Sequence, residues 1–385
     1  MKLGLFKLFG LEREEHSIVI FMLLQAFLIG IFYAIFNIIA HAVFLSRFDE
    51  TDMARAYIFS GLAGIVLTSL YYLVKARLKF SFFSVINLFF IFLVTVCLWI
   101  VSRTDPEPLV VYLVFISLGP VFILAMLGLR STVSGIFTLR MGERLTGMID
   151  SGLIAGMIIG SFSVPAMLYL KIDIHNMLPV SAGSILVAFL IQMIITGRYK
   201  TNTVQDKNTG SNSVSYRVIF NNRFIKYLAV FLLLSVIVLF FVQYSFMALT
   251  RLRYPGEIEM ARFLGFFEGV MMFVALMINM FLVSYIIKKQ GFVVAVILTP
   301  VLIGIFTIIA IIAGSGNGFL PGAQGFLFFF LIIALSRLFS RALNITVEKT
   351  VINIMNQVTG SKLRDRLRSV FEGSMNEASV LVAGL

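Results

Sequence analysis

The sequence predicts an all-α polytopic membrane protein, and three observations lead to this fold class. Of the 385 residues, 59% are hydrophobic and only 13% are charged, and the mean hydropathy is +1.00. Apolar runs of about 20 residues or more recur along the chain, which is the length that a helix needs to cross a bilayer. One long polar run, 197–223, divides them into two series. A lone strand cannot satisfy its backbone in lipid, so each run is predicted to be a helix.

Six apolar runs precede the polar run, and four complete ones follow it. The first six cover residues 18–45, 56–74, 80–101, 109–137, 145–170 and 177–196. The next four cover 224–249, 263–287, 292–313 and 326–354, and a last run, 370–385, ends with the sequence. We predict an N-terminal six-helix bundle over 1–197, a cytoplasmic linker over 198–223 and a C-terminal bundle over 224–385.

The C-terminal series is one and a half helices shorter than the N-terminal series, because the run 370–385 stops within an apolar segment. We expect the missing helices to follow residue 385, since half a helix would otherwise have no partner in the bundle. The alternative is a protein of ten spans with a re-entrant tail.

The distribution of Lys and Arg predicts the orientation in the membrane. Twenty of the 31 basic residues fall in the N-terminal segment and in every second connection, and seven fall in the other connections. Cytoplasmic segments are enriched in Lys and Arg, so we expect a multi-pass protein of the inner (plasma) membrane with a cytoplasmic N-terminus. The net charge of +12 is scattered over the ends of the spans, so nucleic acid is not an expected partner.

The sequence carries no pattern of a catalytic or metal site. It lacks metal-ligand spacing, a nucleophile elbow and paired catalytic carboxylates, and the Gly-rich stretch 314–322 lacks the Lys and the strand of a phosphate-binding loop. We therefore expect neither an enzyme nor a cofactor.

Ionisable side chains inside membrane spans are costly and usually functional. The tenth span places Arg337, Arg341, Asn344 and Glu348 at spacings of four, three and four, which puts them on one face of an α-helix. In one interpretation the arginines line a central cavity and hold an anionic group, which a guanidinium can grip bidentately. In the other, the stripe is an ion-pair ladder that includes Lys349 and holds the bundle together.

Further candidates lie in the fourth and eighth spans. Arg130 in the fourth span precedes several hydroxyl residues and is a candidate cavity residue. In the eighth span, Glu268 and Asn279 are eleven residues apart and share a helix face. Glu268 can balance an arginine of the tenth span or carry a coupling proton. The alternative is a salt bridge with Arg262 at the outer end.

Two spans carry other patterns with a structural interpretation. In the first span, Tyr33, Asn37 and His41 form a polar stripe that is interpreted either as hydrogen-bonded structure or as part of a solute site. In the fifth span, Gly152, Gly156 and Gly160 are four residues apart, and this small-residue stripe predicts the close approach of a second helix.

Six spans, a linker and a second similar series are the layout of the major facilitator superfamily, in which two bundles surround a midplane site. Four stretches carry a closer resemblance: 41–57 (HAVFLSRFDETDMARAY), 142–161 (GERLTGMIDSGLIAGMIIGS), 241–291 and 366–385 (RLRSVFEGSMNEASVLVAGL). They resemble the nucleotide transporter family of ATP/ADP carrier proteins, and most closely its bacterial branch. The resemblance implies the major facilitator fold and allows for helical-repeat and cyclic-nucleotide-binding domains after residue 385.

These observations predict a secondary transporter that moves an anionic solute, nucleotide-like or an organic anion, by alternating access. The alternative is a non-transporting sensor or scaffold domain of a larger signalling protein. The first span departs from the pattern of the carriers because it has no Lys or Arg before Arg47, and this favours the alternative. The arginines retained in the tenth span oppose it.

Overall fold

The computed structural model describes residues 15–77, 80–103, 108–137, 139–199, 223–286, 289, 291–317 and 325–348. In these ranges the secondary structure is helical, without a strand. The long helices are α2 (Glu15–Arg47), α3 (Glu50–Arg77), α4 (Phe80–Arg103), α5 (Pro108–Ile136), α6 (Leu139–Tyr169), α7 (Leu178–Arg198), α9 (Arg223–Arg253), α10 (Glu257–Met277), α12 (Phe292–Asn317) and α13 (Phe326–Leu343). The short elements are a 3-10 helix, η1 (Ile174–Met177), two π-helical segments, η2 (Ile278–Leu282) and η4 (Asn344–Glu348), and α11 (Val283–Tyr285).

Ten helical segments of the described chain are long and apolar enough to cross a membrane, and they coincide with the ten complete runs predicted from the sequence. The predicted all-α membrane fold is therefore confirmed. Three helices begin six residues earlier than the apolar runs indicate, α3 at Glu50, α6 at Leu139 and α10 at Glu257. Polar residues continue a helix outside the hydrocarbon core, so an apolar run marks the crossing and not the full helix.

The linker and the last apolar run cannot be compared with the structure. Residues 200–222 and 349–385 lie outside the described residues. The bundle boundaries at 197 and 224 and the incomplete eleventh span therefore remain predictions.

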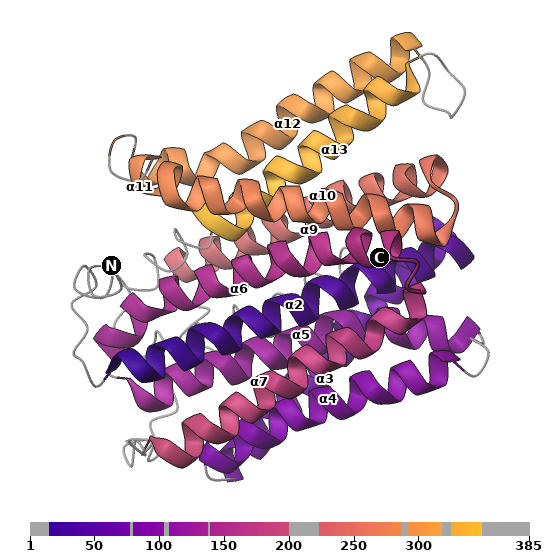
Figure 1. The fold of residues 1–385 in the computed structure, drawn as a ribbon. Coiled ribbons are helices and arrows are strands. Elements are labelled where there is room, and N and C mark those ends of the chain that lie inside the picture. Colours follow the sequence, from indigo (N-terminus) through magenta and orange to yellow (C-terminus); the bar gives the residue numbers. More distant parts are fainter. Residues whose placement is uncertain are drawn as a thin grey trace.

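Helix α2 is the central helix of α2–α7, which we call the N-terminal set (Figure 1). It packs against α5, α6 and α7, while α3 packs against α5, and α4 against α5 and α7. Most of the largest fully buried side chains of the described chain come from α2, among them Phe32, Phe36 and Phe44. The second half of α2 is almost entirely buried, whereas Ile20 and Leu24 in its first half are exposed.

The glycine stripe of α6 faces α2. A Cβ atom at Gly152 would lie 2.9 Å from the carbonyl oxygen of Leu23, and one at Gly156 would overlap the carbonyl oxygen of Phe27. Gly160 is equally close to the α2 backbone. The close packing that this stripe predicts is therefore confirmed, and it fixes α2 against α6 with almost no intervening side chain.

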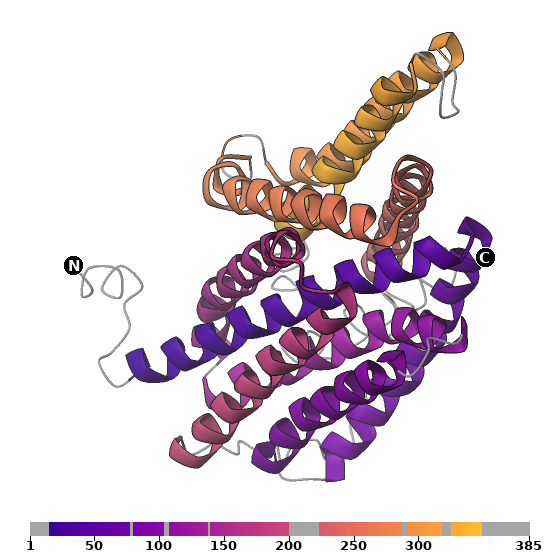
Figure 2. The ribbon, with the colours of Figure 1, turned by 45° about the vertical axis from the view of Figure 1, so that its right-hand side comes forward.

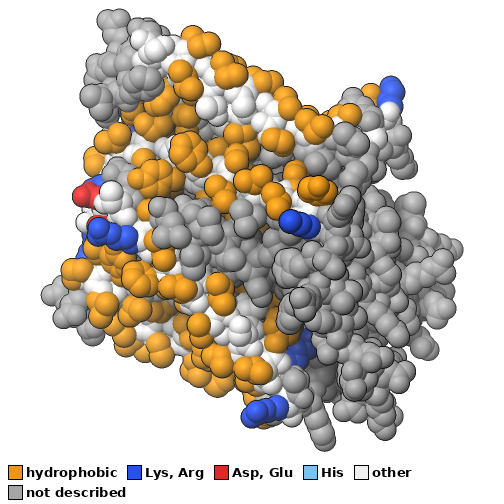
Figure 3. Space-filling view, turned by 180° about the vertical axis from the view of Figure 1, so that it is seen from behind, with side chains coloured by type: hydrophobic (Ala, Val, Ile, Leu, Met, Phe, Trp, Pro, Cys, Tyr) orange, Lys and Arg blue, Asp and Glu red, His pale blue; other side chains and the backbone are white. Residues whose placement is uncertain are grey.

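Helices α9–α13, which we call the C-terminal set, meet the N-terminal set chiefly through α10. This helix packs against α6 and α2, and α13 packs against α9, α10 and α12. Figures 1 and 2 show α12 and α13 as a pair that extends away from the N-terminal set. In Figure 3, hydrophobic side chains cover the described surface between two separated groups of charged side chains, as expected for a protein that crosses a bilayer.

Candidate functional site

Two buried charged side chains lie where the C-terminal set faces the N-terminal set. Arg337 of α13 is 4% exposed and Glu268 of α10 is 6% exposed. Glu268 interacts electrostatically with Arg337 and, to a lesser degree, with Arg341 one turn further along α13. Within the described residues, no ion pair joins Glu268 to either arginine or to Arg262. The carboxylate therefore balances the arginines through space and does not occupy their hydrogen-bonding groups.

The guanidinium of Arg337 retains hydrogen-bonding capacity. Its Nε is buried and has no hydrogen-bond partner among the described residues. Buried polar groups of proteins are nearly always hydrogen-bonded, and buried charges are usually paired, so such a donor needs a specific explanation. An arginine in this state has the chemistry to bind an anion through two parallel N–H donors.

Tyr33 of α2 brings the N-terminal set to the arginines. Its phenol lies within hydrogen-bonding reach of the Arg341 side chain and within electrostatic range of Arg337 and Glu268. The Tyr33 ring packs on Phe122 of α5, with 3.9 Å between the ring centroids. The cluster therefore combines a pair of guanidinium groups, one carboxylate and an aromatic hydroxyl from both sets.

A chain of hydrogen bonds adjoins this cluster. Nε2 of Gln243 in α9 donates to the Tyr57 hydroxyl of α3 at 2.8 Å, and this hydroxyl is 3.4 Å from Nε2 of His41. Nδ1 of His41 lies 2.9 Å from the carbonyl oxygen of Asn37. A carbonyl only accepts, so Nδ1 carries the proton, and Nε2 of the neutral ring is left to accept from Tyr57.

The structure brings five of the predicted site residues together. Glu268, Arg337 and Arg341 form the charged cluster, and Asn37 and His41 lie on the hydrogen-bonded chain beside it. Tyr57 connects the two groups because it interacts electrostatically with Arg337 as well as with His41.

Arg130 lies apart from this cluster. It is in electrostatic range of Tyr72 of α3. The next residue of α5, Ser131, accepts a hydrogen bond of 2.9 Å from Lys75 near the end of α3. The groups that interact with Arg337 do not include Arg130. Arg130 and Arg337, both candidate site residues, therefore occupy different regions of the described chain.

The single-face stripe predicted for the tenth span needs a correction. The α-helix ends at Leu343, and Asn344 opens the π-helical segment η4. The N–H of Asn344 still bonds to the carbonyl oxygen of Ser340, so Asn344 keeps its α-helical alignment with the arginines. A π-helix closes its hydrogen bonds between residues i and i+5, so the α-helical spacing that aligned Glu348 with them does not hold. The side chain of Glu348 lies outside the described part of the chain, and so does Lys349, so the ion-pair ladder stays a prediction.

Asn279 also lies in a π-helical segment, η2, which extends α10. Sequence periodicity gave no signal for either π-helical segment. Such segments occur frequently at functional sites, where they change the direction of the side chains that follow.

Two residues of the hydrogen-bonded chain were not among the predicted site residues. Gln243 is a polar residue inside a span, but its facing partner could not be placed from the sequence. Tyr57 lies one residue inside the second predicted span, where a tyrosine is normal for a membrane interface. Only the packing of α3 near α9 shows that the two side chains meet.

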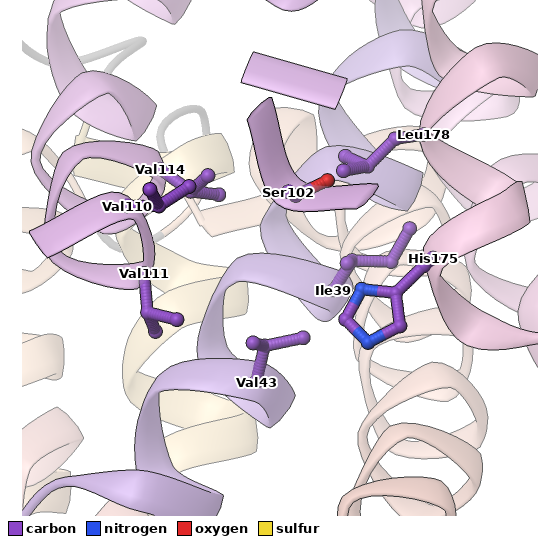
Figure 4. A pocket seen from close by; sticks show the side chains of 8 residues that line it. All are labelled: Ile39, Val43, Ser102, Val110, Val111, Val114, His175 and Leu178. Atoms are coloured by element: carbon purple, nitrogen blue, oxygen red, sulfur yellow. The ribbon is translucent and has the colours of Figure 1, made fainter. Parts of the chain in front are cut away.

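A separate apolar cavity lies in the N-terminal set, near the end where α2 meets η1 (Figure 4). It contains none of the predicted site residues. Its lining is formed by Ile39, Val43, Ser102, Val110, Val111, Val114, His175 and Leu178.

Membrane-spanning helices in two sets, with buried arginines and a carboxylate where the sets meet, define a polytopic membrane protein of the major facilitator type. Solved structures of this fold resemble the chain. The nucleoside transporter NupG gives a TM-score of 0.64 at 13% identity, covering 95% of this chain and 89% of that one. The xylose transporter XylE from E. coli in an inward-open conformation gives 0.61 at 12% identity, covering 96% and 88%. A bacterial homolog of the human lysosomal transporter Spinster gives 0.60 at 15% identity, covering 97% and 82%.

The sequence matches one family model over part of its length. Residues 155–339 match the family model of the TLC ATP/ADP transporter, which confirms the predicted resemblance to the nucleotide transporter family. The matched segment includes Glu268 and Arg337. No curated protein sequence matches the chain significantly. The family match and the fold together support a multi-pass membrane transporter of a small solute.

Proposed function

We propose that the protein is a secondary transporter that moves a small anionic solute across the membrane by alternating access. The observation that carries this proposal is the buried Nε of Arg337, which has no hydrogen-bond partner among the described residues. An anionic oxygen on the solute would supply that partner, and it would compensate the positive charge that burial makes costly.

The neighbours of Arg337 supply additional hydrogen-bond donors, charge balance and a group that can carry a proton. Arg341 and the Tyr33 hydroxyl offer additional donors to the same solute group. Glu268 is close enough to both arginines to balance their charge when the site is empty, or to take up a proton that moves with the solute. The match to the ATP/ADP transporter family supports a nucleotide-like anion, and an organic anion is the second solute class.

The position of the site supports alternating access. Residues of α2 and α3 in the N-terminal set and of α9, α10 and α13 in the C-terminal set contribute to it. When two bundles rock about a site between them, the site opens to one side of the membrane at a time. The orientation proposed for this cycle has the N-terminus and the linker 198–223 in the cytoplasm, as the distribution of Lys and Arg predicts.

A sensor or scaffold role is the second candidate, because one observation favours it. Between His16 and Arg47, α2 carries no Lys or Arg, and its polar residues near the site are Tyr33, Asn37 and His41. The carriers of the resembling family place charged residues in this helix. A domain of this kind would pass a signal to other domains or proteins.

Ligand-dependent thermal stabilisation of the purified protein tests the two candidates. The panel contains nucleotides, phosphorylated metabolites and organic anions, and a ligand at a hundred times its Kd stabilises the folded state by about 2.7 kcal/mol. We expect at least one anion to stabilise the wild-type protein and to lose this effect in Arg337→Gln. The exposed Arg262 of α10 supplies the matched control, because Arg262→Gln should respond like the wild type. A flat response from a well-folded wild-type protein would favour the sensor or scaffold.

A further inference from the structure

One ion pair and one histidine–carboxylate contact join the N-terminal and C-terminal sets at the same end of the molecule. Nη1 of Arg251 lies 2.7 Å from Oδ1 of Asp49, and Nε2 of His175 lies 3.6 Å from Oε1 of Glu257. Asp49 connects α2 to α3, and His175 lies in η1 between α6 and α7. Arg251 is in the last turn of α9 and Glu257 in the first turn of α10. The distribution of Lys and Arg predicts that this end faces outward.

The polarity of the two contacts alternates between the sets. The N-terminal set contributes the carboxylate of the first contact and the imidazole of the second, whereas the C-terminal set contributes the guanidinium and then the carboxylate. Exchanging the partners would bring the carboxylates of Asp49 and Glu257 towards each other. Like charges facing each other are unfavourable, so the arrangement accepts one alignment of the two sets.

His175 is fixed to the N-terminal set by its surroundings. Its ring lines the apolar cavity of Figure 4, beside Ile39 and Val43 of α2. The next residue, Asn176, accepts a hydrogen bond from Arg103 at the end of α4. Glu257 belongs to a long helix of the other set. The contact between His175 and Glu257 therefore breaks when the two sets separate at this end.

Helices α10 and α6 pack tightly between Glu257 of the second contact and Glu268 of the site. A Cβ atom at Gly265 of α10 would lie 2.6 Å from Cδ of Pro165, and one at Gly269 would lie 2.8 Å from the ring of Phe162. Pro165 and Phe162 lie in the part of α6 nearest η1. The backbones of α10 and α6 thus meet closely in the stretch of α10 that leads from Glu257 to Glu268.

We propose that Asp49–Arg251 and His175–Glu257 form a two-point latch that holds this end of the transporter closed. The latch must open for solute to reach Arg337 from the predicted outer side, and its alternating polarity returns the two sets to the same alignment in each cycle. This inference rests on the proposed alternating access. Both contacts are partly solvent-exposed, so each stabilises the closed end modestly, and together they allow rapid opening.

Labelling of a partly buried reporter cysteine tests the latch in the full chain. The sequence has one cysteine, Cys97, which is exposed and is first replaced by Ser. A cysteine at Phe240, whose ring packs on Tyr57 between the two sets, then reports access from the outer side to a membrane-impermeant maleimide. In this background we expect Arg251→Gln and Glu257→Gln each to increase the labelling rate about two- to five-fold, the range that partly exposed ion pairs produce.

Matched controls separate the latch from a general loss of charge. Arg253 and Glu259 are exposed and lie two residues from the latch residues, so Arg253→Gln and Glu259→Gln should label like the parent. The exchanged pair Asp49→Arg with Arg251→Asp should restore slow labelling. Parent-like labelling of folded Arg251→Gln and Glu257→Gln would overturn the latch, and so would fast labelling of the exchanged pair.

The labelling assay needs no solute, so the latch and the proposed function can fail separately. If the protein transports an anion but Arg251→Gln and Glu257→Gln label like the parent, the latch alone is wrong. If labelling responds as expected but no anion binds, the latch holds and the assignment of Arg337 as an anion site is overturned.

Discussion

Gln243 of α9 donates a hydrogen bond of 2.8 Å to the hydroxyl of Tyr57 in α3, so the two sets are joined by neutral side chains beside the buried Arg337. A neutral hydrogen bond can break and re-form without moving a charge through the low-dielectric interior. This contact is therefore suited to a place where two bundles must separate during transport. It also sets the position of His41, which accepts from the same hydroxyl.

We expect Tyr57→Phe to weaken the contact between the sets. Coupling energies of side-chain hydrogen bonds in membrane proteins average about 0.6 kcal/mol. A double-mutant cycle of Tyr57→Phe and Gln243→Leu, measured by reversible unfolding in detergent, should give a coupling of this size. Tyr169→Phe is the control because Tyr169 is 86% exposed. Strictly additive effects of the two substitutions would show that the hydrogen bond does not form.

Arg337→Lys tests whether the site needs a guanidinium or only a positive charge. Lysine keeps the charge but loses the planar pair of donors that grips an anionic group. We expect the affinity for the stabilising anion to fall about ten-fold or more, equivalent to losing one charge-assisted hydrogen bond of about 1.5–3 kcal/mol. Equilibrium binding to the purified protein is the measurement, with Arg262→Lys as control. Wild-type affinity in folded Arg337→Lys would exclude bidentate recognition.

Glu268→Gln separates charge balance from proton coupling. The substitution keeps the shape of the side chain and removes both the negative charge and the ability to carry a proton. If Glu268 carries the coupling proton, uptake into vesicles will lose its response to a pH gradient while exchange of solute across the membrane continues. The exposed Glu259 of the same helix is the control, and Glu259→Gln should keep the response. A full gradient response in Glu268→Gln would assign the proton to another group.

Gly156→Ala should destabilise the N-terminal set. The added methyl group would overlap the carbonyl oxygen of Phe27, so α2 and α6 would have to move apart. Overpacking of a well-packed core costs about 1–3 kcal/mol, and the unfolding free energy should fall by this amount. A Cβ atom at Gly183 of α7 meets nothing within 4 Å, so Gly183→Ala should be neutral or stabilising. Equal stability of the two variants would contradict the close approach of α2 and α6.

Several features of the fold followed from the sequence because they depend on local chemistry. The ten complete spans follow from hydrocarbon thickness and backbone hydrogen bonding, both of which act within one segment. The contact of Gly156 with α2 was foreseeable as close packing, since a stripe of glycines has no other common use in a membrane helix. The glycine stripe did not identify α2 as the partner helix, because glycine can pack against the surface of many helices.

The sequence by itself determined that this chain crosses the membrane in helices and that Arg337, Arg341 and Glu268 are unusual there, because a charged side chain in a span loses its hydration whichever helices surround it. Only the tertiary structure decided which of the costly groups meet. It grouped Glu268 with the arginines, brought Tyr33 and Gln243 to their partners, added Tyr57, and placed Arg130 elsewhere. Helix periodicity fixes the face of a side chain on its own helix, whereas the partner across the interface depends on how two separate sets of helices dock.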